Sequence, residues 1–237
     1  IKMAMWNPWR GCHKYSEGCR FCYIHKGDYK RGIDTNQIVK TDKFYAPILK
    51  NKKGDYKIKS GQIVYLCFST DFLIEDADKW RVECWKMIKE RSDLTFLFLT
   101  KRIERFLKCI PDDWNNGYDN VVVGCTIENQ NKADLRLTIF DKLPIRHKNI
   151  ICQPLIEKVD ISDHLKDIEL VVVGGESDYN ARPLDCEWVL SIREQCIRKN
   201  VHFEFRQCGT YFIKDGKTYN LNVKELCSQA KKAGINF

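Results

Sequence analysis

The sequence lacks any uninterrupted apolar run near the roughly 20 residues that a helix needs to cross a bilayer. It also lacks a basic segment followed by an apolar stretch, which would mark a secretory signal. No linker rich in Pro, Gly or Ser and no internal repeat divides the chain. We therefore expect a cytoplasmic protein with no membrane association and a single domain over residues 1–237.

Cysteine is too sparse for a disulfide-stabilised scaffold. The chain has 12 cysteines among 237 residues, about 5%, whereas small secreted domains held by disulfides exceed roughly 8–10%. Several of the cysteines lie in apolar or helical contexts, where a buried small hydrophobic residue is the ordinary interpretation. They include Cys67, Cys84, Cys125, Cys152 and Cys196.

The net charge is the next constraint on partners. Lys and Arg outnumber Asp and Glu by 40 to 32, which gives +8 at pH 7. This balance permits a nucleotide, a nucleic acid or another anionic partner. Because Lys and Arg occur along the whole chain, an ordinary solvated surface is the alternative.

From about residue 62, short β-rich runs alternate with amphipathic stretches, which is the pattern of repeated βα units around a parallel sheet. The predicted strands are residues 2–6, 62–68, 95–99, 120–126, 149–153, 169–173 and 201–206. The stretches with apolar residues three and four apart predict helices at residues 78–90, 102–109, 130–140 and 186–199.

Seven strands with crossover helices indicate an α/β fold, specifically an incomplete parallel (β/α) barrel. Three further segments frame it. Residues 7–25 form an N-terminal loop, residues 45–61 form a polar insert, and residues 210–237 form a hairpin followed by a last helix.

Three thiols in the N-terminal loop form the strongest chemical motif. Cys12, Cys19 and Cys22 are spaced as C-x6-C-x2-C, and thiolates are soft ligands that suit iron-sulfur clusters. Gly11 and Gly18 provide backbone freedom directly before two of them. Three cysteines leave one iron of a four-iron cluster without a protein ligand, and an exogenous amine and carboxylate can bind there.

Two alternatives stay open for this motif. His25 follows Cys22 by three positions, so the three cysteines and His25 could close a Cys3His zinc site. The thiols could also be ordinary free cysteines, although three thiols in eleven residues of polar, glycine-containing sequence are unusual for a core.

A set of ordered blocks carries a resemblance. WNPWRGCHKYSEGCRFCY is followed by FSTDF, FLFLTKR, GCTIENQNKADLR, CQPLIE, VVVGGESDYNARPLDCEWVLSIREQC and FEFRQCG, between Trp6 and Gly209. Together they resemble the phage-associated three-cysteine-motif family, which is similar to radical S-adenosylmethionine enzymes. The resemblance implies a [4Fe-4S] cluster, S-adenosylmethionine as cofactor, and a three-Cys-motif partner protein. It also implies that Phe21, the aromatic residue directly before the third cysteine, lies at the cofactor.

The chain departs from that pattern at defined positions. Six residues separate Cys12 from Cys19, where radical enzymes have three, and the Gly174-Gly175-Glu176 sequence follows a late strand rather than the second. Gln153 stands where the family more often has Glu. The last strand ends in Arg206-Gln207-Cys208-Gly209 rather than K-Q-W-G.

Polar residues recur where the predicted strands end, and in a parallel barrel the carboxyl ends of the strands converge on the ligand site. The alternative is that they are helix caps and turn residues, with Asp71 and Asn129 as the clearest cap candidates. The residues concerned are Ser69, Thr70, Asp71, Thr100, Lys101, Arg102, Thr126, Glu128, Asn129, Gln153, Gly174, Gly175, Glu176, Arg206 and Gln207.

The chemistry of these residues suggests roles. Gly174 and Gly175 allow a ligand to approach the backbone, and Glu176, with Asp71 and Glu128 as alternatives, could accept hydrogen bonds from the ammonium or ribose of the cofactor. The predicted substrate-binding residues, which would receive a carboxylate or phosphate, are Lys101, Arg102, Gln153, Arg182 and Arg206. Trp9 and Tyr23 could shield the cluster.

The sequence therefore predicts a radical S-adenosylmethionine enzyme that abstracts hydrogen from an unidentified substrate, with a nucleotide or nucleic acid preferred. The competing hypothesis is a non-enzymatic accessory module. Such a module would recognise nucleic acid or the partner protein, and structural zinc or a redox-sensing cluster would stabilise it.

Overall fold

The computed structural model describes residues 2–237, and the chain divides into two compact units. Unit 1 consists of residues 2–13, 27–124 and 143–147, and unit 2 of residues 14–26, 125–142 and 148–237. Ile1, the first residue of the predicted domain, lies outside the described residues. Both units are assembled from stretches that alternate along the chain. The single domain over residues 1–237 stays a prediction.

Unit 1 contains the first strands and the helices that follow them. Its core is aromatic: Trp85 on α2 packs edge-on against Phe72 and Phe98, with ring centroids 5.1 and 6.5 Å away. Its elements are β1 (Met3–Trp6), β2 (Trp9–Arg10), β3 (Val39–Lys40), η2 (Ala46–Ile48), β4 (Ile63–Leu66), η3 (Glu75–Ala77), α2 (Asp78–Glu90), β5 (Thr95–Thr100), η4 (Ile103–Arg105), α3 (Phe106–Cys109) and most of β6 (Val121–Thr126).

Unit 2 contains the later strands and most of the cysteine-bearing N-terminal loop. Its helix α5 buries Val189, Ile192 and Cys196 on one side, as the three- and four-residue spacing requires. Its elements are η1 (Glu17–Cys19), the first half of α1 (Tyr23–Lys30), α4 (Gln130–Phe140), β7 (His147–Cys152), η5 (Ser162–His164), β8 (Ile168–Gly174), β9 (Leu184–Asp185), α5 (Cys186–Lys199), β10 (His202–Gln207), β11 (Tyr211–Lys214), β12 (Lys217–Asn220) and α6 (Leu226–Lys232).

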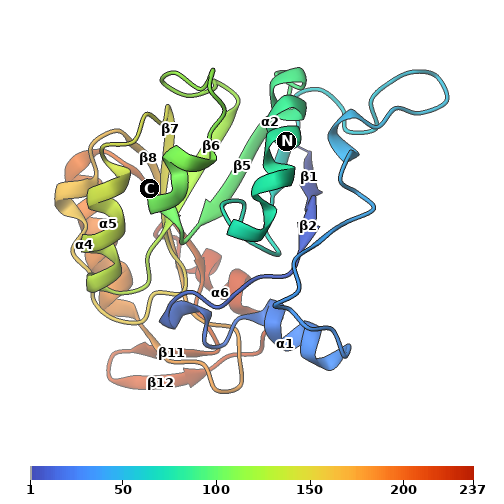
Figure 1. Cartoon of the computed structure of the whole chain (residues 1–237). Coiled ribbons are helices and arrows are strands. Elements are labelled where there is room, and N and C mark those ends of the chain that lie inside the picture. Colours follow the sequence, from blue (N-terminus) through green and yellow to red (C-terminus); the bar gives the residue numbers. More distant parts are fainter. Residues whose placement is uncertain (1) are drawn as a thin grey trace. The chain divides into compact units, whose positions relative to one another are not determined.

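Seven strands are hydrogen-bonded into one sheet in the order β1-β4-β5-β6-β7-β8-β10 (Figure 1). The strand pairs are parallel, with Met3 opposite Ile63 between β1 and β4, and Ile150 opposite Val171 between β7 and β8. Among the described residues, β1 and β10 form the two edges and are not paired with each other. The α/β class and the seven predicted strands are confirmed, and an open parallel sheet is the arrangement of an incomplete barrel.

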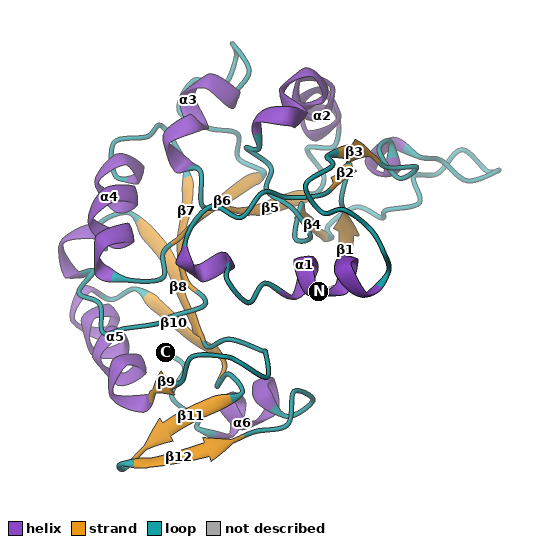
Figure 2. Ribbon diagram, turned by 60° about the horizontal axis from the view of Figure 1, so that its bottom comes forward, coloured by secondary structure: helices purple, strands orange, loops and turns teal. Residues whose placement is uncertain are grey.

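The C-terminal part of unit 2 covers the free edge of β10. Phe203 and Phe237 exchange two backbone hydrogen bonds, at 2.8 and 3.0 Å. The predicted hairpin is confirmed as β11 and β12, joined by Asp215 and Gly216, which both have positive φ as a tight hairpin turn requires. Strand β9 pairs with β11, so the hairpin belongs to a small three-stranded sheet (Figure 2).

Several elements were not predicted from the sequence. Helix α1 lies partly in the predicted N-terminal loop, and the predicted helix at residues 102–109 divides into η4 and α3. The insert at residues 45–61 contains η2 and an antiparallel bridge between Lys50 and Tyr56. It projects from unit 1 as a long loop (Figure 1).

In the part of the chain that the structure describes, no helix combines the length and the apolar composition that a membrane span requires.

Candidate functional site

The three cysteines of the motif differ in exposure from most of the others. Cys12, Cys19 and Cys22 are all partly exposed, and no cysteine of the described chain is in a disulfide. Burial raises the pKa of Cys67 and Cys152 well above the ordinary value, so these two thiols stay protonated and are poor metal ligands. The thiols of the motif are therefore the better candidates for ligation.

In unit 1, backbone contacts fix the turn that carries Cys12. The Cys12 N–H donates to the Thr35 carbonyl at 2.8 Å, and Thr70 donates its hydroxyl to the Gly11 carbonyl. Gly11 has φ of +94°, and a Cβ there would lie 2.4 Å from the Gln37 carbonyl oxygen. Only glycine fits this position, so the residue before Cys12 is determined by packing of the chain on itself.

A buried ion pair lies beside this turn in unit 1. Asp71 accepts hydrogen bonds from the Thr100 hydroxyl at 2.9 Å, the Lys101 N–H at 3.1 Å and Arg102 Nη1 at 3.3 Å. Arg102 also donates to the His13 carbonyl at 3.1 Å. Burial alone would lower the pKa of Arg102, but the charges of Asp71 and Cys12 outweigh it and the pKa is raised.

Cys19 and Cys22 lie one turn apart in unit 2. Cys19 ends η1, and the Cys22 N–H donates to the Cys19 carbonyl at 3.4 Å. In a turn of this kind, side chains at positions i and i+3 fall on the same side. The backbone turn therefore allows both thiols to face the same side, which agrees with the C-x2-C spacing.

A second buried ion pair, also in unit 2, lies under the Cys19 turn. Glu128 and Arg136 are 0% and 1% exposed and are joined at 2.8 Å. The Gly18 N–H points to Glu128 Oε1 at 3.5 Å, and a Cβ on Gly18 would meet the Glu128 side chain at 3.3 Å. Asn129 caps α4 by accepting from the Lys132 N–H, so its prediction as a cap is confirmed.

The loop after β8 holds the same cysteine-bearing segment from another side. Arg182 forms a forked ion pair with buried Glu176, donates to the Glu17 carbonyl at 2.9 Å, and lies over the Phe21 ring at 5.7 Å. Hydrogen bonding to Glu176 raises the pKa of Arg182. The two residues predicted to bind ligand groups of opposite charge are thus paired with each other.

Lys26 and Asp178 add a further contact between the cysteine-bearing segment and this loop. Lys26 Nζ lies 2.6 Å from Asp178 Oδ2, and the Asp178 side chain is buried. All of these contacts lie within unit 2. They fix the position of Cys19 and Cys22 relative to the carboxyl ends of β6 and β8.

Gly174 and Gly175 are packed against the chain itself. A Cβ on Gly175 would lie 2.8 Å from the Cys208 carbonyl oxygen, and one on Gly174 would lie 2.9 Å from Gln153 Cδ. Gln207 donates its side-chain amide to the Gly175 carbonyl at 2.6 Å. These contacts account for both glycines by packing, and their role as cofactor ligands stays a prediction.

The remaining predicted residues belong in part to unit 1 and in part to unit 2. Arg206 pairs with Glu204 on its own strand at 2.8 Å, and Gln153 contacts Gly174. Asp71 also accepts from the Leu73 N–H, whereas α2 begins after Ala77, so Asp71 closes a turn and does not cap that helix. Trp9 is fully buried beside Phe72, and Tyr23 is 64% exposed.

Cys12, Cys19 and Cys22 are the type of ligand that an iron-sulfur cluster requires. Three partly exposed thiols that are in no disulfide are present, and two of them share a turn. Within residues 2–237, no three His, Cys, Asp or Glu side chains form an arrangement that could hold a metal ion. The fit therefore rests on the donor type and the spacing, for the cluster and for the Cys3His alternative alike.

Sequence reasoning missed Arg136, Lys26 and Asp178. A signal for Arg136 was present, because it falls in the stripe Ala133, Arg136, Leu137 that α4 buries, and a charged residue in such a stripe needs a buried partner. Nothing in the sequence pairs Lys26 with Asp178, which lie 152 residues apart.

The sheet order defines an α/β protein with an open parallel sheet, and its N-terminal segment carries three partly exposed cysteines that are in no disulfide. The chain matches, over residues 2–234, the family described as Protein of unknown function (DUF5131), and it belongs to that family. Comparison with curated proteins and with solved structures gives no significant match.

Proposed function

We propose that this protein holds a [4Fe-4S] cluster on Cys12, Cys19 and Cys22 and is an enzyme of the radical S-adenosylmethionine type. The observation that carries the proposal is the C-x6-C-x2-C segment, whose thiols are in no disulfide and are partly exposed, while most other cysteines are buried. The ordered blocks between Trp6 and Gly209 support it by their resemblance to such enzymes. The substrate class that we prefer is a nucleotide or a nucleic acid.

When bound, the reduced cluster would supply one electron to cleave the sulfonium of S-adenosylmethionine, and the adenosyl radical would then abstract hydrogen from the substrate. The protein's own contribution is to hold the thiols. Glu128 with Arg136, and Glu176 with Arg182, keep the Cys19–Cys22 turn in place from two strand ends. This arrangement supports the proposal because cluster ligands need a rigid surround.

The test is anaerobic reconstitution with iron and sulfide, followed by dithionite and S-adenosylmethionine. We expect a brown protein with roughly four irons per chain, an electron paramagnetic resonance signal after reduction, and formation of 5′-deoxyadenosine. Alanine variants of Cys12, Cys19 and Cys22 should each lose the iron or keep a degraded cluster. Cys186→Ala and Cys227→Ala are matched controls, since both thiols are at least partly exposed and lie outside the motif.

The competing hypothesis makes a different prediction. A colourless protein with stoichiometric zinc, which His25→Ala removes as completely as Cys22→Ala, would favour the non-enzymatic accessory module. A brown protein that neither binds nor cleaves S-adenosylmethionine would overturn the enzymatic part of the proposal and leave a cluster-based sensor.

A further inference from the structure

The net charge of the protein is concentrated in one stretch of sequence. Residues 7–61 contain thirteen Lys and Arg against five Asp and Glu, and the difference of eight equals the net charge of the whole chain. The same stretch contains Tyr15, Tyr23, Tyr29 and Tyr45, which are four of the six strongly exposed tyrosines. Positive charge interleaved with exposed aromatic rings is typical of surfaces that bind single-stranded nucleic acid.

The basic residues at the strand ends do not explain this charge. Arg102 is paired with Asp71, Arg182 with Glu176, and Arg206 with Glu204. By contrast, Lys30, Arg20 and Lys52 are exposed and form no ion pair within the described chain. Exposed cations without an ion pair are therefore present within residues 7–61, next to the exposed tyrosines of that stretch.

Helix α1, which begins directly after Cys22, presents the aromatic and basic side chains together. Tyr23, Lys26, Tyr29 and Lys30 are spaced three and four residues apart, so they share one side of the helix. Tyr23 is 64% exposed and Tyr29 is 86% exposed. Asp28, on the other side, is buried and pairs with Arg31.

Two exposed tyrosine rings on one side of a short helix leave apolar area in water that a partner can cover. Tyr29 packs on no other ring in the described residues. A base can stack on such a ring, and Lys30, the next residue along the helix, can contact the adjoining phosphate. Lys26, held by Asp178, fixes the first part of the helix.

We infer that the exposed side of α1, on which Tyr23, Tyr29 and Lys30 lie, binds single-stranded nucleic acid by base stacking on the tyrosines and a phosphate contact with Lys30. The inference goes beyond the proposed function, because it concerns binding and does not involve the cluster. A protein without iron can bind nucleic acid, and a protein with a complete cluster can fail to bind it, so the two proposals are tested separately.

The test measures fluorescence anisotropy of a fluorescein-labelled 20-nucleotide single strand, DNA and RNA in turn, with the protein as purified at 50 mM salt. Tyr29→Ala should weaken binding about fivefold or more, the lower end of what one stacked base contributes, and Tyr29→Phe should restore it. Lys30→Gln should reduce the slope of log affinity against log salt by about 0.7.

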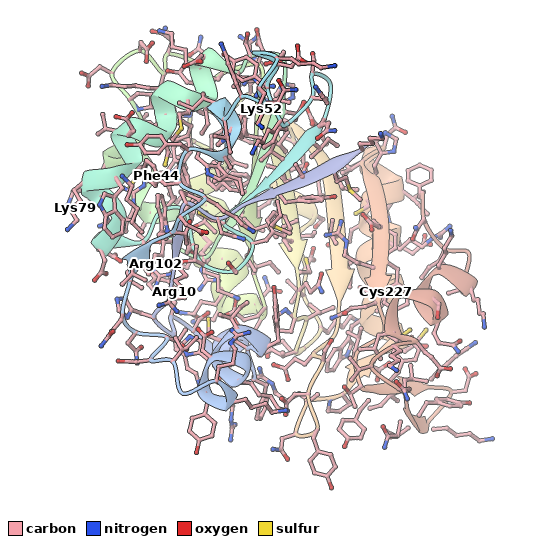
Figure 3. The ribbon with its side chains drawn as sticks, turned by 90° about the vertical axis from the view of Figure 1, so that its right-hand side faces the viewer. Arg10, Phe44, Lys52, Lys79, Arg102 and Cys227 are labelled. Atoms are coloured by element: carbon pink, nitrogen blue, oxygen red, sulfur yellow. The ribbon has the colours of Figure 1, made fainter. Side chains whose placement is uncertain are left out.

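Lys52→Gln is the matched control for charge. Lys52 belongs to the projecting insert at the end of unit 1 away from Arg10 (Figure 3), and its replacement removes the same single charge. Equal losses in Lys52→Gln and Lys30→Gln would show binding by net charge alone and would overturn the inference. So would absence of binding, an unchanged affinity in Tyr29→Ala, full competition by duplex DNA, or preferential binding to phosphatidylserine vesicles.

Discussion

The buried pair of Glu128 and Arg136 gives the sharpest prediction about stability. Their side chains are 0% and 1% exposed, and Glu128 is the partner that balances the Arg136 charge. Arg136 Nη1 also donates to the Thr126 carbonyl at 2.8 Å, but Nε and Nη2 have no hydrogen-bond partner in the described chain. Glu128→Gln keeps the shape of the side chain and leaves a buried, uncompensated guanidinium.

Removing one partner of a buried ion pair costs about 3–5 kcal/mol. If the free energy of unfolding falls by about 2–3 kcal/mol per molar of urea, the upper part of the range for small proteins, the unfolding midpoint should drop by roughly 1–2.5 M. The assay is equilibrium urea unfolding followed by circular dichroism. Because the Gly18 N–H points to Glu128, the variant should also show faster proteolysis within residues 14–26.

Glu204→Gln is the matched control, because it makes the same substitution in the Glu204–Arg206 pair, whose side chains are each 34% exposed. An exposed ion pair contributes only about 0.2–1 kcal/mol to the free energy of unfolding. The double variant Glu128→Gln with Arg136→Met should recover part of the lost stability, since it removes the uncompensated charge. A loss in Glu128→Gln no larger than in Glu204→Gln would refute the reasoning.

Two further predictions concern the loop after β8 and the buried thiols. Gly175→Ala should lower the free energy of unfolding by about 1–3 kcal/mol, because the new Cβ meets backbone atoms of Cys208 and Gly209. Gly174→Ala should lower it less, because there the new Cβ meets glutamine side chains that can move. Thermal unfolding checks this, and an equal or larger loss in Gly174→Ala would contradict it. Burial raises the pKa of Cys208 to about 11, so its thiolate is scarce at pH 8. Alkylation of Cys208 should therefore be slow at pH 8 and should accelerate as the pH approaches 11. Timed iodoacetamide labelling and mass spectrometry measure this, with exposed Cys227 as the internal comparison; equal rates at pH 8 would show that the site opens freely.

The regular elements were largely predictable because their patterns are local. The bounds of α2, α4 and α5 agree with the stretches predicted from three- and four-residue spacing. The seven strands were marked by continuous apolar runs, as strands covered on both faces are. The two-residue strands β2, β3 and β9 have no such pattern, and they depend on contacts with distant segments.

The candidate site was predictable in its composition but not in its pairing. The sequence identified Asp71, Arg102, Glu176 and Arg182 as polar residues near strand ends, but it could not show that they neutralise each other. Asp71 and Arg102 lie 31 residues apart, and their pairing depends on the register of β4 against β5. Side-chain direction at the end of a strand is set by such packing, which residue types alone do not encode.

The contacts that hold the cysteine-bearing segment have a consequence for the order of events during synthesis. Glu17 and Arg182 are 165 residues apart, and Lys26 and Asp178 are 152 residues apart. At the usual pace of translation, roughly 10–30 s pass between the appearance of the first partner and the second. Cys19 and Cys22 therefore leave the ribosome long before their supporting residues exist, and for that interval they are open to oxidation and to whichever metal is present. Any metal that these two thiols capture in that interval is captured before the residues that hold the segment in place exist.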